Sequence, residues 1–277
     1  MKQTTLARTS SLVEAPRVPD TRSRILPNLL ISVAVFIAAF ILAVNPDVFD
    51  RPLSTMINSI AGRSNIFDNL VVAAYYFPTF SGAILVSLIW SCWFDNTDAE
   101  HRSRILVGAL ASLAVGGLSR LLQHILPTHP RPYYDPAIHF KLPSGVVNLP
   151  LNTWNSFPSD HVVVFSGLAI VIFVARSRFA LAAIILTAVV ELARIYYGAH
   201  YPSDLLGGAA LASMAIWAAQ APLPVSLGRL AVGWEQRRPS LFYMAAFFIS
   251  YQIATLAGDL RWVASMLRSA YGMTRGF

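Results

Sequence analysis

The sequence is poor in charge and contains a single cysteine. Charged residues make up 13% of the 277 positions and hydrophobic residues 55%, whereas about 25% of residues are charged in a typical soluble domain. This shortage excludes an ordinary soluble domain and predicts an integral membrane protein. Cys92 has no second cysteine with which to form an intrachain disulfide, and its apolar neighbours predict a packed small side chain.

The positive charges do not form a contiguous stripe. The net charge is +7, but the basic residues lie mostly between apolar runs, where they indicate membrane orientation and not nucleic-acid binding. Residues 1–24 are polar and basic, and they lack the apolar core and the small-residue cleavage site of a secretory signal. We therefore predict a cytoplasmic polar tail and no nucleic-acid partner.

Long apolar runs dominate the rest of the chain. Several approach or exceed the about 18–20 residues that cross the hydrocarbon core of a bilayer. They predict an all-α, polytopic membrane bundle with six core spans and a seventh. The runs lie at 25–44, 69–94, 105–118, 162–175, 179–190, 205–221 and 241–258.

These runs divide the chain into three parts. Residues 1–24 form the tail, and residues 25–221 a six-span membrane domain that carries the polar motifs. Residues 222–277 are expected to hold a basic loop, the extra span and an amphipathic tail at 261–271 that lies in the membrane interface. A re-entrant or surface segment at 241–258 is the alternative to the seventh span, because a span there leaves basic residues on the outer side.

The loops alternate in character if the N-terminus is cytoplasmic. The basic loops at 176–178 and 229–238 fall on the inner side, as positively charged loops usually do. The loops at 45–68, 127–160 and 199–204 fall on the outer side. All the polar motifs therefore share one membrane face.

One polar motif, Pro158-Ser159-Asp160-His161, opens the apolar run at 162–175. A proline and an acid suit the first turn of a helix, and the free N–H groups at a helix start bind anions. Ser159 adds a hydroxyl and His161 adds a proton donor at the membrane rim. This position favours a catalytic role for His161 over simple solvation.

A second motif runs from Arg194 through His200 to Asp204. Pro202 restarts a helix, so Asp204 lies in its first turn and can reach back to His200. A carboxylate on one imidazole nitrogen fixes the tautomer and raises the basicity of the other nitrogen, which predicts a nucleophile. Arg194 can grip phosphate oxygens, and it can also pair with Glu191 three residues earlier.

The remaining motif is His124 followed by Arg131-Pro132. Arg131 is a candidate second phosphate clamp, and its alternative is snorkelling at the interface. His129 and His139 lie in the long outer loop, where we expect solvated side chains.

Together the three motifs resemble the signature of the type 2 phosphatidic acid phosphatase family. That signature reads Lys-x6-Arg-Pro, then Pro-Ser-Gly-His, then Ser-Arg-x5-His-x3-Asp, and the resemblance covers about residues 105–221. Three positions depart from it, because His124 replaces the lysine, Asp160 the glycine and Ala193 the serine. His124 has to be charged to substitute for the lysine. The matching residues are Arg131, Pro132, Pro158, Ser159, His161, Arg194, His200 and Asp204.

The resemblance implies a metal-independent hydrolase without a cofactor. His200 would attack phosphorus and form a phosphohistidine, Asp204 would orient it, and His161 would protonate the leaving oxygen and later activate water. The phosphoryl oxygens would be held by Arg131, Arg194, Ser159 and His124. The His and Asp residues could imitate a metal site, but each has a role without a metal.

A site at the lipid rim predicts an amphiphilic substrate. A polyprenyl diphosphate of a bacterial envelope lipid cycle is the first choice, and a phosphatidate-like lipid or a lipid A phosphate is the alternative. The expected place is the bacterial inner membrane, with the site on the periplasmic face and membrane lipids as surroundings. Two other classes stay open, namely a non-catalytic protein that retains the scaffold and a transporter with a histidine proton relay.

Overall fold

The apolar runs form helices. In the computed structural model, which describes residues 21–147, 151 and 154–270, the chain has eleven α-helices, one short 3-10 helix and no strand. The predicted all-α class is confirmed. The helices are α1 (Thr21–Val44), α2 (Asp50–Asn58), α3 (Asn65–Tyr76), α4 (Pro78–Asp95), α5 (Ala99–Ile125), α6 (Asp160–Val174), α7 (Ala180–Tyr196), α8 (Pro202–Ala219), α9 (Pro222–Arg237), α10 (Pro239–Ala254) and α11 (Gly258–Ala270), with the 3-10 helix η1 at Pro132–Tyr134.

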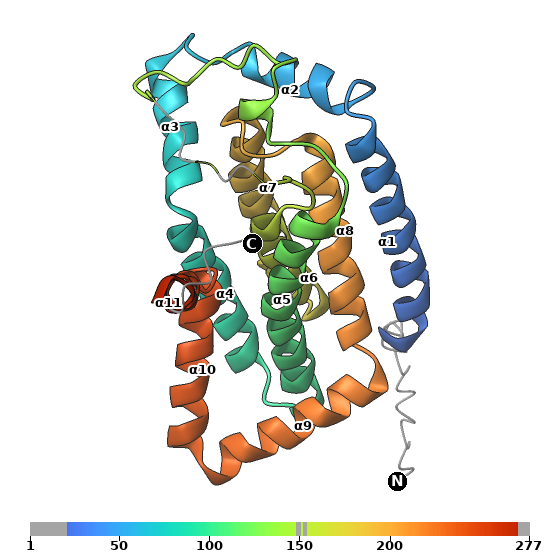
Figure 1. The fold of residues 1–277 in the computed structure, drawn as a ribbon. Helices are drawn as coiled ribbons and strands as arrows, with labels where there is room; N and C mark the ends of the chain where they lie inside the picture. The colour runs from blue at the N-terminus through green and yellow to red at the C-terminus, as the bar shows by residue number, and fades with distance from the viewer. Residues whose placement is uncertain (1–20, 148–150, 152–153, 271–277) are drawn as a thin grey trace, which may run out of the picture.

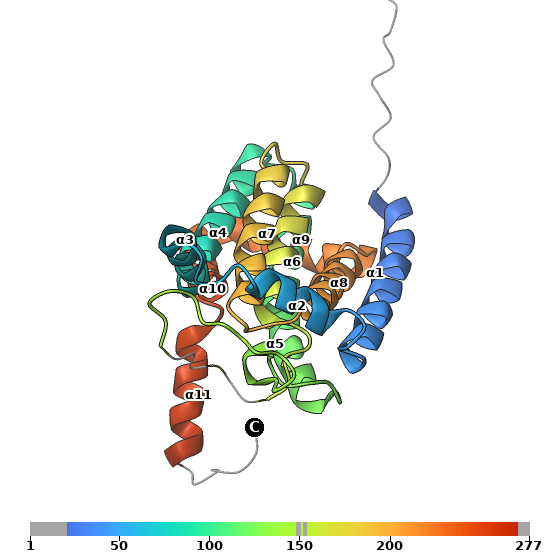
Figure 2. The same ribbon diagram turned by 90° about the horizontal axis from the view of Figure 1, so that it is seen from above.

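Helix α6 occupies the centre of the bundle. It packs against α4, α5, α7 and α8, and α1 lies along the outer side of α8 (Figures 1 and 2). Phe165, Leu168 and Ile172 of α6 are fully buried. A helix that is hydrophobic on all sides is either buried among other helices or exposed to lipid, and the packing of α6 against four helices places it in the first class. Most of the predicted tail, residues 1–20, lies outside the described residues.

The number of helices long enough to span is smaller than the number of apolar runs. α1 and α5 are each long and apolar enough to cross a membrane, and two bent pairs, α3 with α4 and α8 with α9, raise the number to four among the described residues. The apolar run at 69–94 is divided into two helices, since α3 and α4 meet at 63° around Phe77. Pro78 begins α4, because proline lacks the N–H that would continue α3. The seven-span count stays a prediction.

The expected basic loop at 229–238 is largely helical. It falls within α9, which runs across the lower end of the bundle in Figure 1. Arg102 Nη1 donates to both carboxylate oxygens of Glu235 at 3.0 Å and thereby holds α9 against α5. A planar guanidinium that bonds both oxygens of one carboxylate fixes orientation as well as distance.

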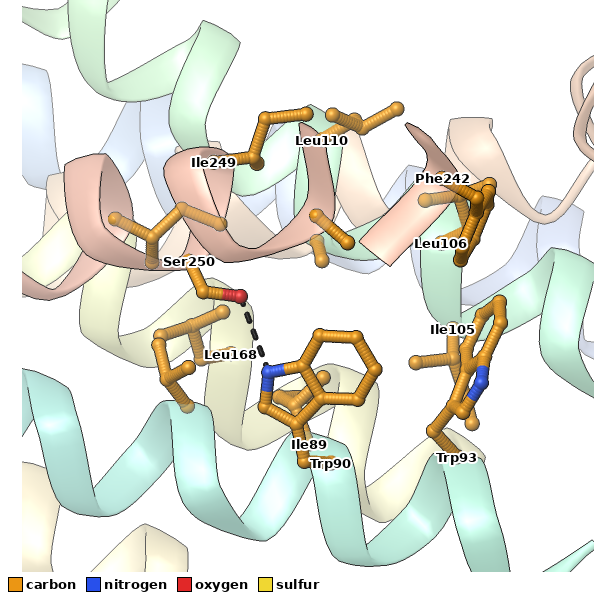
Figure 3. A pocket seen from close by; sticks show the side chains of 14 residues that line it. Ile89, Trp90, Trp93, Ile105, Leu106, Leu110, Leu168, Phe242, Ile249 and Ser250 are labelled. Carbon is orange, nitrogen blue, oxygen red and sulfur yellow. Dashed lines mark hydrogen bonds between the residues drawn. The ribbon is translucent and has the colours of Figure 1, made fainter. Parts of the chain in front are cut away.

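Helix α10 packs on α4 and α5 around a small apolar cavity of about 60 Å³, where Trp90 Nε1 donates to Ser250 Oγ at 3.1 Å (Figure 3). The chain then turns at Leu256 and Ala257, both with φ of 53°, and α11 runs crosswise to α10 (Figures 1 and 2). Several apolar side chains of α11 are exposed, among them Leu260, Trp262 and Val263. The interfacial position of this segment stays a prediction.

Candidate active site

The three sequence motifs meet at one end of the bundle. α5 and α7 end there, whereas α6 and α8 begin there (Figure 1). Arg131 contacts His200, and the backbone N–H of Ser159 donates to the Asp204 carbonyl at 3.2 Å. The grouping of the motifs predicted from the loop alternation is therefore present, although their side of the membrane stays a prediction.

His200 lies in the tight connection between α7 and α8. Gly198 adopts a φ of +72° in this turn, a conformation that favours glycine because it has no Cβ. The His200 side chain is almost fully buried. Its Nδ1 is 3.1 Å from the Ser156 carbonyl oxygen and 3.3 Å from Asp204 Oδ2. Both neighbours accept hydrogen bonds, so Nδ1 carries the proton.

The other ring nitrogen of His200 faces a cation. Arg131 Nη1 is 3.2 Å from His200 Nε2 and 2.7 Å from the Ala199 carbonyl oxygen. A guanidinium can only donate, so Nε2 presents its lone pair. Burial lowers the pKa of His200, and the charge of Arg131 lowers it further, whereas Asp204 opposes both effects. The arrangement therefore holds a neutral imidazole with an available Nε2.

Asp204 is held by the start of its own helix. Its Oδ2 accepts a hydrogen bond of 2.7 Å from the Tyr201 backbone N–H, in addition to the contact with His200. The side chain is fully buried. A carboxylate at a helix N-terminus is stabilised by the free N–H groups there, so Asp204 can stay ionised beside the imidazole that it orients.

Both predicted clamp arginines are buried. Arg131 is 5% exposed and Arg194 is 3% exposed, so interfacial snorkelling of Arg131 is excluded. Arg194 Nε lies 3.0 Å from Glu191 Oε2, an ion-pair contact without the angle of a hydrogen bond, and its guanidinium lies over the Tyr75 ring. Arg194 acts electrostatically on both His161 and His200. The pairing with Glu191 and the proximity to the histidines are both present.

The segment before α6 is held by α5. Ser119 Oγ and Gln123 Nε2 both donate to the Pro158 carbonyl, at 3.0 Å and 2.7 Å. Ser159 is fully buried, and its hydroxyl has no hydrogen-bond partner among the described residues. Gly208 of α8 approaches so closely that a Cβ there would lie 2.9 Å from the Ser159 carbonyl oxygen. The close packing of α8 keeps Ser159 and Asp204 together.

His161 begins α6 beside a carboxylate. Its Nδ1 is 2.9 Å from Asp160 Oδ1, and Asp160 Oδ2 is 3.1 Å from Arg120 Nη2. The sequence motifs did not single out Arg120, which lies inside the long helix α5. The usable signal was the charge itself, because an ionisable residue inside an apolar helix usually has a partner and a function.

His124 lies in the last turn of α5, at the position of the family's lysine. Its ring packs against Trp154, with 4.9 Å between the ring centroids, and it is half-buried. Trp154 also lies beneath the Arg120 guanidinium and donates to Gln123 Oε1. The structure thus places His124 at the rim of the site, and its phosphate-binding role stays a prediction.

Sequence reasoning missed a polar layer behind His200. Asp50 of α2 accepts from the backbone N–H and the hydroxyl of Ser203 at 2.9 Å and 2.5 Å. Asp135 accepts from Arg51 Nε at 2.8 Å and from the Tyr201 hydroxyl at 2.6 Å. No local spacing could indicate these contacts, because the partners lie far apart in the chain.

The expectation of a solvated His129 is wrong. This side chain is 7% exposed, and its Nε2 lies 3.4 Å from Asp50 Oδ2. Burial lowers the pKa of His129, but Asp50, Asp204 and the Pro130 carbonyl together raise it by more, so the net shift is upward. The outer loop folds back over α2 and covers the histidine. His139, in contrast, is exposed as expected.

The chain is similar to several known proteins. The PAP2 superfamily model matches residues 102–223. The undecaprenyl-diphosphatase BcrC of Bacillus subtilis (strain 168) is 24% identical over 156 residues, which are 56% of this chain and 75% of that protein. The bacitracin transport permease protein BcrC of Bacillus licheniformis is 39% identical over 57 residues, 21% of this chain and 28% of that protein.

One solved structure is also similar. It is the crystal structure of a transmembrane PAP2-type phosphatidylglycerolphosphate phosphatase from Bacillus subtilis, with a TM-score of 0.43 and 17% identity. The match covers 71% of this chain and 93% of that one.

Proposed function

Because residues 102–223 match the PAP2 superfamily model and the chain is an integral membrane protein, we propose that it is a lipid phosphatase that removes a phosphate from a polyprenyl diphosphate. The observation that carries the proposal is the buried His200 imidazole. Its Nδ1 faces the Ser156 carbonyl and Asp204, and its Nε2 faces Arg131. This is the arrangement required for attack on an anionic phosphorus.

In the first step, His200 Nε2 forms a bond to the terminal phosphorus. The bond from phosphorus to the bridging oxygen breaks, and His161 gives its proton to that oxygen, so the lipid monophosphate leaves. Arg131 and Arg194 balance the charge on the phosphoryl oxygens. Preorganised donors of this kind cost no reorganisation at the moment of reaction. Ser159 supplies its hydroxyl as a further donor, which has no other hydrogen-bond partner among the described residues.

In the second step, water replaces His200. His161 takes a proton from the water, whose oxygen attacks the phosphorus of the phosphohistidine, and the bond from phosphorus to Nε2 breaks. Inorganic phosphate leaves and the free imidazole returns. Asp204 keeps the same tautomer through both steps, because its carboxylate accepts the Nδ1 proton throughout.

The choice of substrate rests on two considerations. The site lies at the end of an apolar bundle, where the phosphate of an amphiphile is accessible while its chain stays in the bilayer. The similarity to an undecaprenyl-diphosphatase supports a polyprenyl diphosphate over a phosphatidate or a lipid A phosphate. Purified protein should release phosphate fastest from the prenyl diphosphate in a panel of these lipids. Release from none of them would favour a non-catalytic protein or a transporter.

We expect inhibition by vanadate and no loss of activity in a chelator. Vanadate adopts the five-coordinate geometry of the phosphoryl group between Arg131 and Arg194, and the proposed steps use side chains alone. The measurement is phosphate release with increasing orthovanadate, and separately after dialysis against EDTA. Activity that disappears in EDTA and returns with a divalent ion would contradict the proposed mechanism.

The lowered pKa of His200 predicts the acid side of the pH profile. Protonation removes the lone pair on Nε2, so kcat/KM should fall only below the ordinary imidazole value of about 6.5, because burial and Arg131 hold the pKa of His200 down. Arg131→Gln should move this acid limb to higher pH, and Asp204→Asn should move it to lower pH. If kcat/KM falls at the same pH in wild type, Arg131→Gln and Asp204→Asn, the group that titrates is not His200.

A further inference from the structure

Three ionisable side chains, His161, Asp160 and Arg120, contact one another in a row. Asp160 Oδ1 is 2.9 Å from His161 Nδ1, and Asp160 Oδ2 is 3.1 Å from Arg120 Nη2. Each carboxylate oxygen therefore has a separate partner. The same carboxylate also accepts a hydrogen bond from the backbone N–H of His161 at 3.0 Å. These contacts fix the position of Asp160 relative to the imidazole.

Arg120 lies on helix α5, which places its guanidinium beside Asp160. Ser119 and Gln123, on the same helix, hold the Pro158 carbonyl, so α5 positions both the backbone before α6 and the carboxylate at its start. Asp160 is 8% exposed. A carboxylate with so little water around it needs a countercharge, and Arg120 supplies it.

A second cation keeps the surroundings of Asp160 positive. Arg120, Asp160 and Arg261 line a cavity of about 400 Å³ between α5, α6 and the junction of α10 with α11. Arg261 acts electrostatically on both Arg120 and Asp160. The other walls of the cavity are apolar, and they include Leu121 and Leu260. Two arginines face one carboxylate here, which favours the ionised form of Asp160 as a hydrogen-bond acceptor.

We propose that Asp160 and Arg120 are positioning residues for His161. Asp160 accepts the Nδ1 proton, which leaves Nε2 as the nitrogen that exchanges a proton with the leaving oxygen and then with water. Arg120 keeps the carboxylate ionised and oriented. Both histidines of the site then have their own carboxylate, His200 with Asp204 and His161 with Asp160. The proposal rests on the proposed function, since it assigns His161 the acid step.

A carboxylate that accepts the second ring N–H of a metal-bound histidine fixes its tautomer and its ring orientation, and loss of that carboxylate typically costs about 10–100-fold. We expect an effect of the same order for the partner of His161. Asp160→Asn keeps the shape but presents an amide that can also donate. We expect kcat to fall about 10–100-fold on an alkyl phosphate, whose leaving oxygen needs a proton, with KM nearly unchanged. On an aryl phosphate, whose leaving group departs without a proton, the loss should be less than about three-fold.

Two variants test Arg120, one that keeps its positive charge and one that removes it. Arg120→Lys retains a cation for Asp160 and should stay close to wild type, whereas Arg120→Gln should resemble Asp160→Asn on the alkyl phosphate. Two exposed residues give matched controls for loss of charge, Arg63→Gln for the arginine and Asp95→Asn for the carboxylate. Equal losses on the alkyl and aryl substrates would assign Asp160 and Arg120 a purely structural role and overturn the proposal.

A second readout does not depend on turnover. The ¹⁵N chemical shifts of the His161 ring, assigned by comparison with His161→Gln, report which nitrogen carries the proton in the neutral ring. We expect the Nδ1–H tautomer in wild type and a shift toward Nε2–H in Asp160→Asn. An unchanged tautomer in Asp160→Asn would overturn the positioning role. If the wild-type protein releases no phosphate but the tautomer still differs between wild type and Asp160→Asn, only the proposed function is contradicted.

Discussion

Replacement of His200 by alanine should abolish phosphate release while the protein stays folded in the membrane. In the proposed mechanism the nucleophile is the Nε2 lone pair, and among the described residues His200 is the histidine whose ring contacts both Asp204 and Arg131. Loss of an attacking group typically costs about 10⁴-fold or more. The measurement is single-turnover phosphate release together with size-exclusion chromatography of the purified variant.

Asp204→Asn is the graded control for this experiment. It damages the orientation and basicity of His200 but keeps the attacking nitrogen, so its loss of activity should be smaller than that of His200→Ala. Acid-labile, base-stable phosphate trapped on the wild-type protein during turnover should be missing from His200→Ala. A His200→Ala protein with wild-type turnover would remove His200 from the mechanism.

The second large effect is expected at Arg194, whose side chain pairs with Glu191 and, in the proposed mechanism, also binds phosphate. Arg194→Leu leaves Glu191 buried without its cation, and breaking a buried ion pair in this way costs about 3–5 kcal/mol of stability. The lost phosphate contact should also lower kcat about 10²–10³-fold, as expected for a missing transition-state donor. Thermal unfolding and phosphate release measure the two effects separately.

A double variant separates these two roles. Glu191→Leu combined with Arg194→Leu replaces the buried pair by apolar side chains, which is often neutral or stabilising. The melting temperature should return toward the wild-type value while activity stays lost. Recovery of activity together with stability would mean that Arg194 contributes only to packing.

The sequence was sufficient for the local parts of the site. His200 and Asp204 are joined by helix geometry, because Pro202 starts α8 and places Asp204 in its first turn. Likewise, Ser159 and His161 are joined by the start of α6. Such contacts depend on a few consecutive residues, so spacing alone predicts them.

Contacts between distant segments could not be predicted in the same way. Arg120 reaches Asp160, and Asp50 reaches Ser203, only after helices have packed against one another. The break between α3 and α4 was also missed, because hydropathy does not distinguish a bent pair from a straight helix. Pro78 was visible in the sequence, but a proline at the first position of a helix and a proline that kinks one look alike there.

The contact of Asp50 with Ser203 has a consequence for how the functional unit is delimited. The family match begins at residue 102, yet the backbone N–H of Ser203, next to Asp204, donates to a carboxylate on α2. Residues 102–223 therefore do not include every residue that holds the start of α8 in place. During synthesis α2 emerges early and α8 late. The contact between Asp50 and Ser203 can therefore form only after α8 has been synthesised.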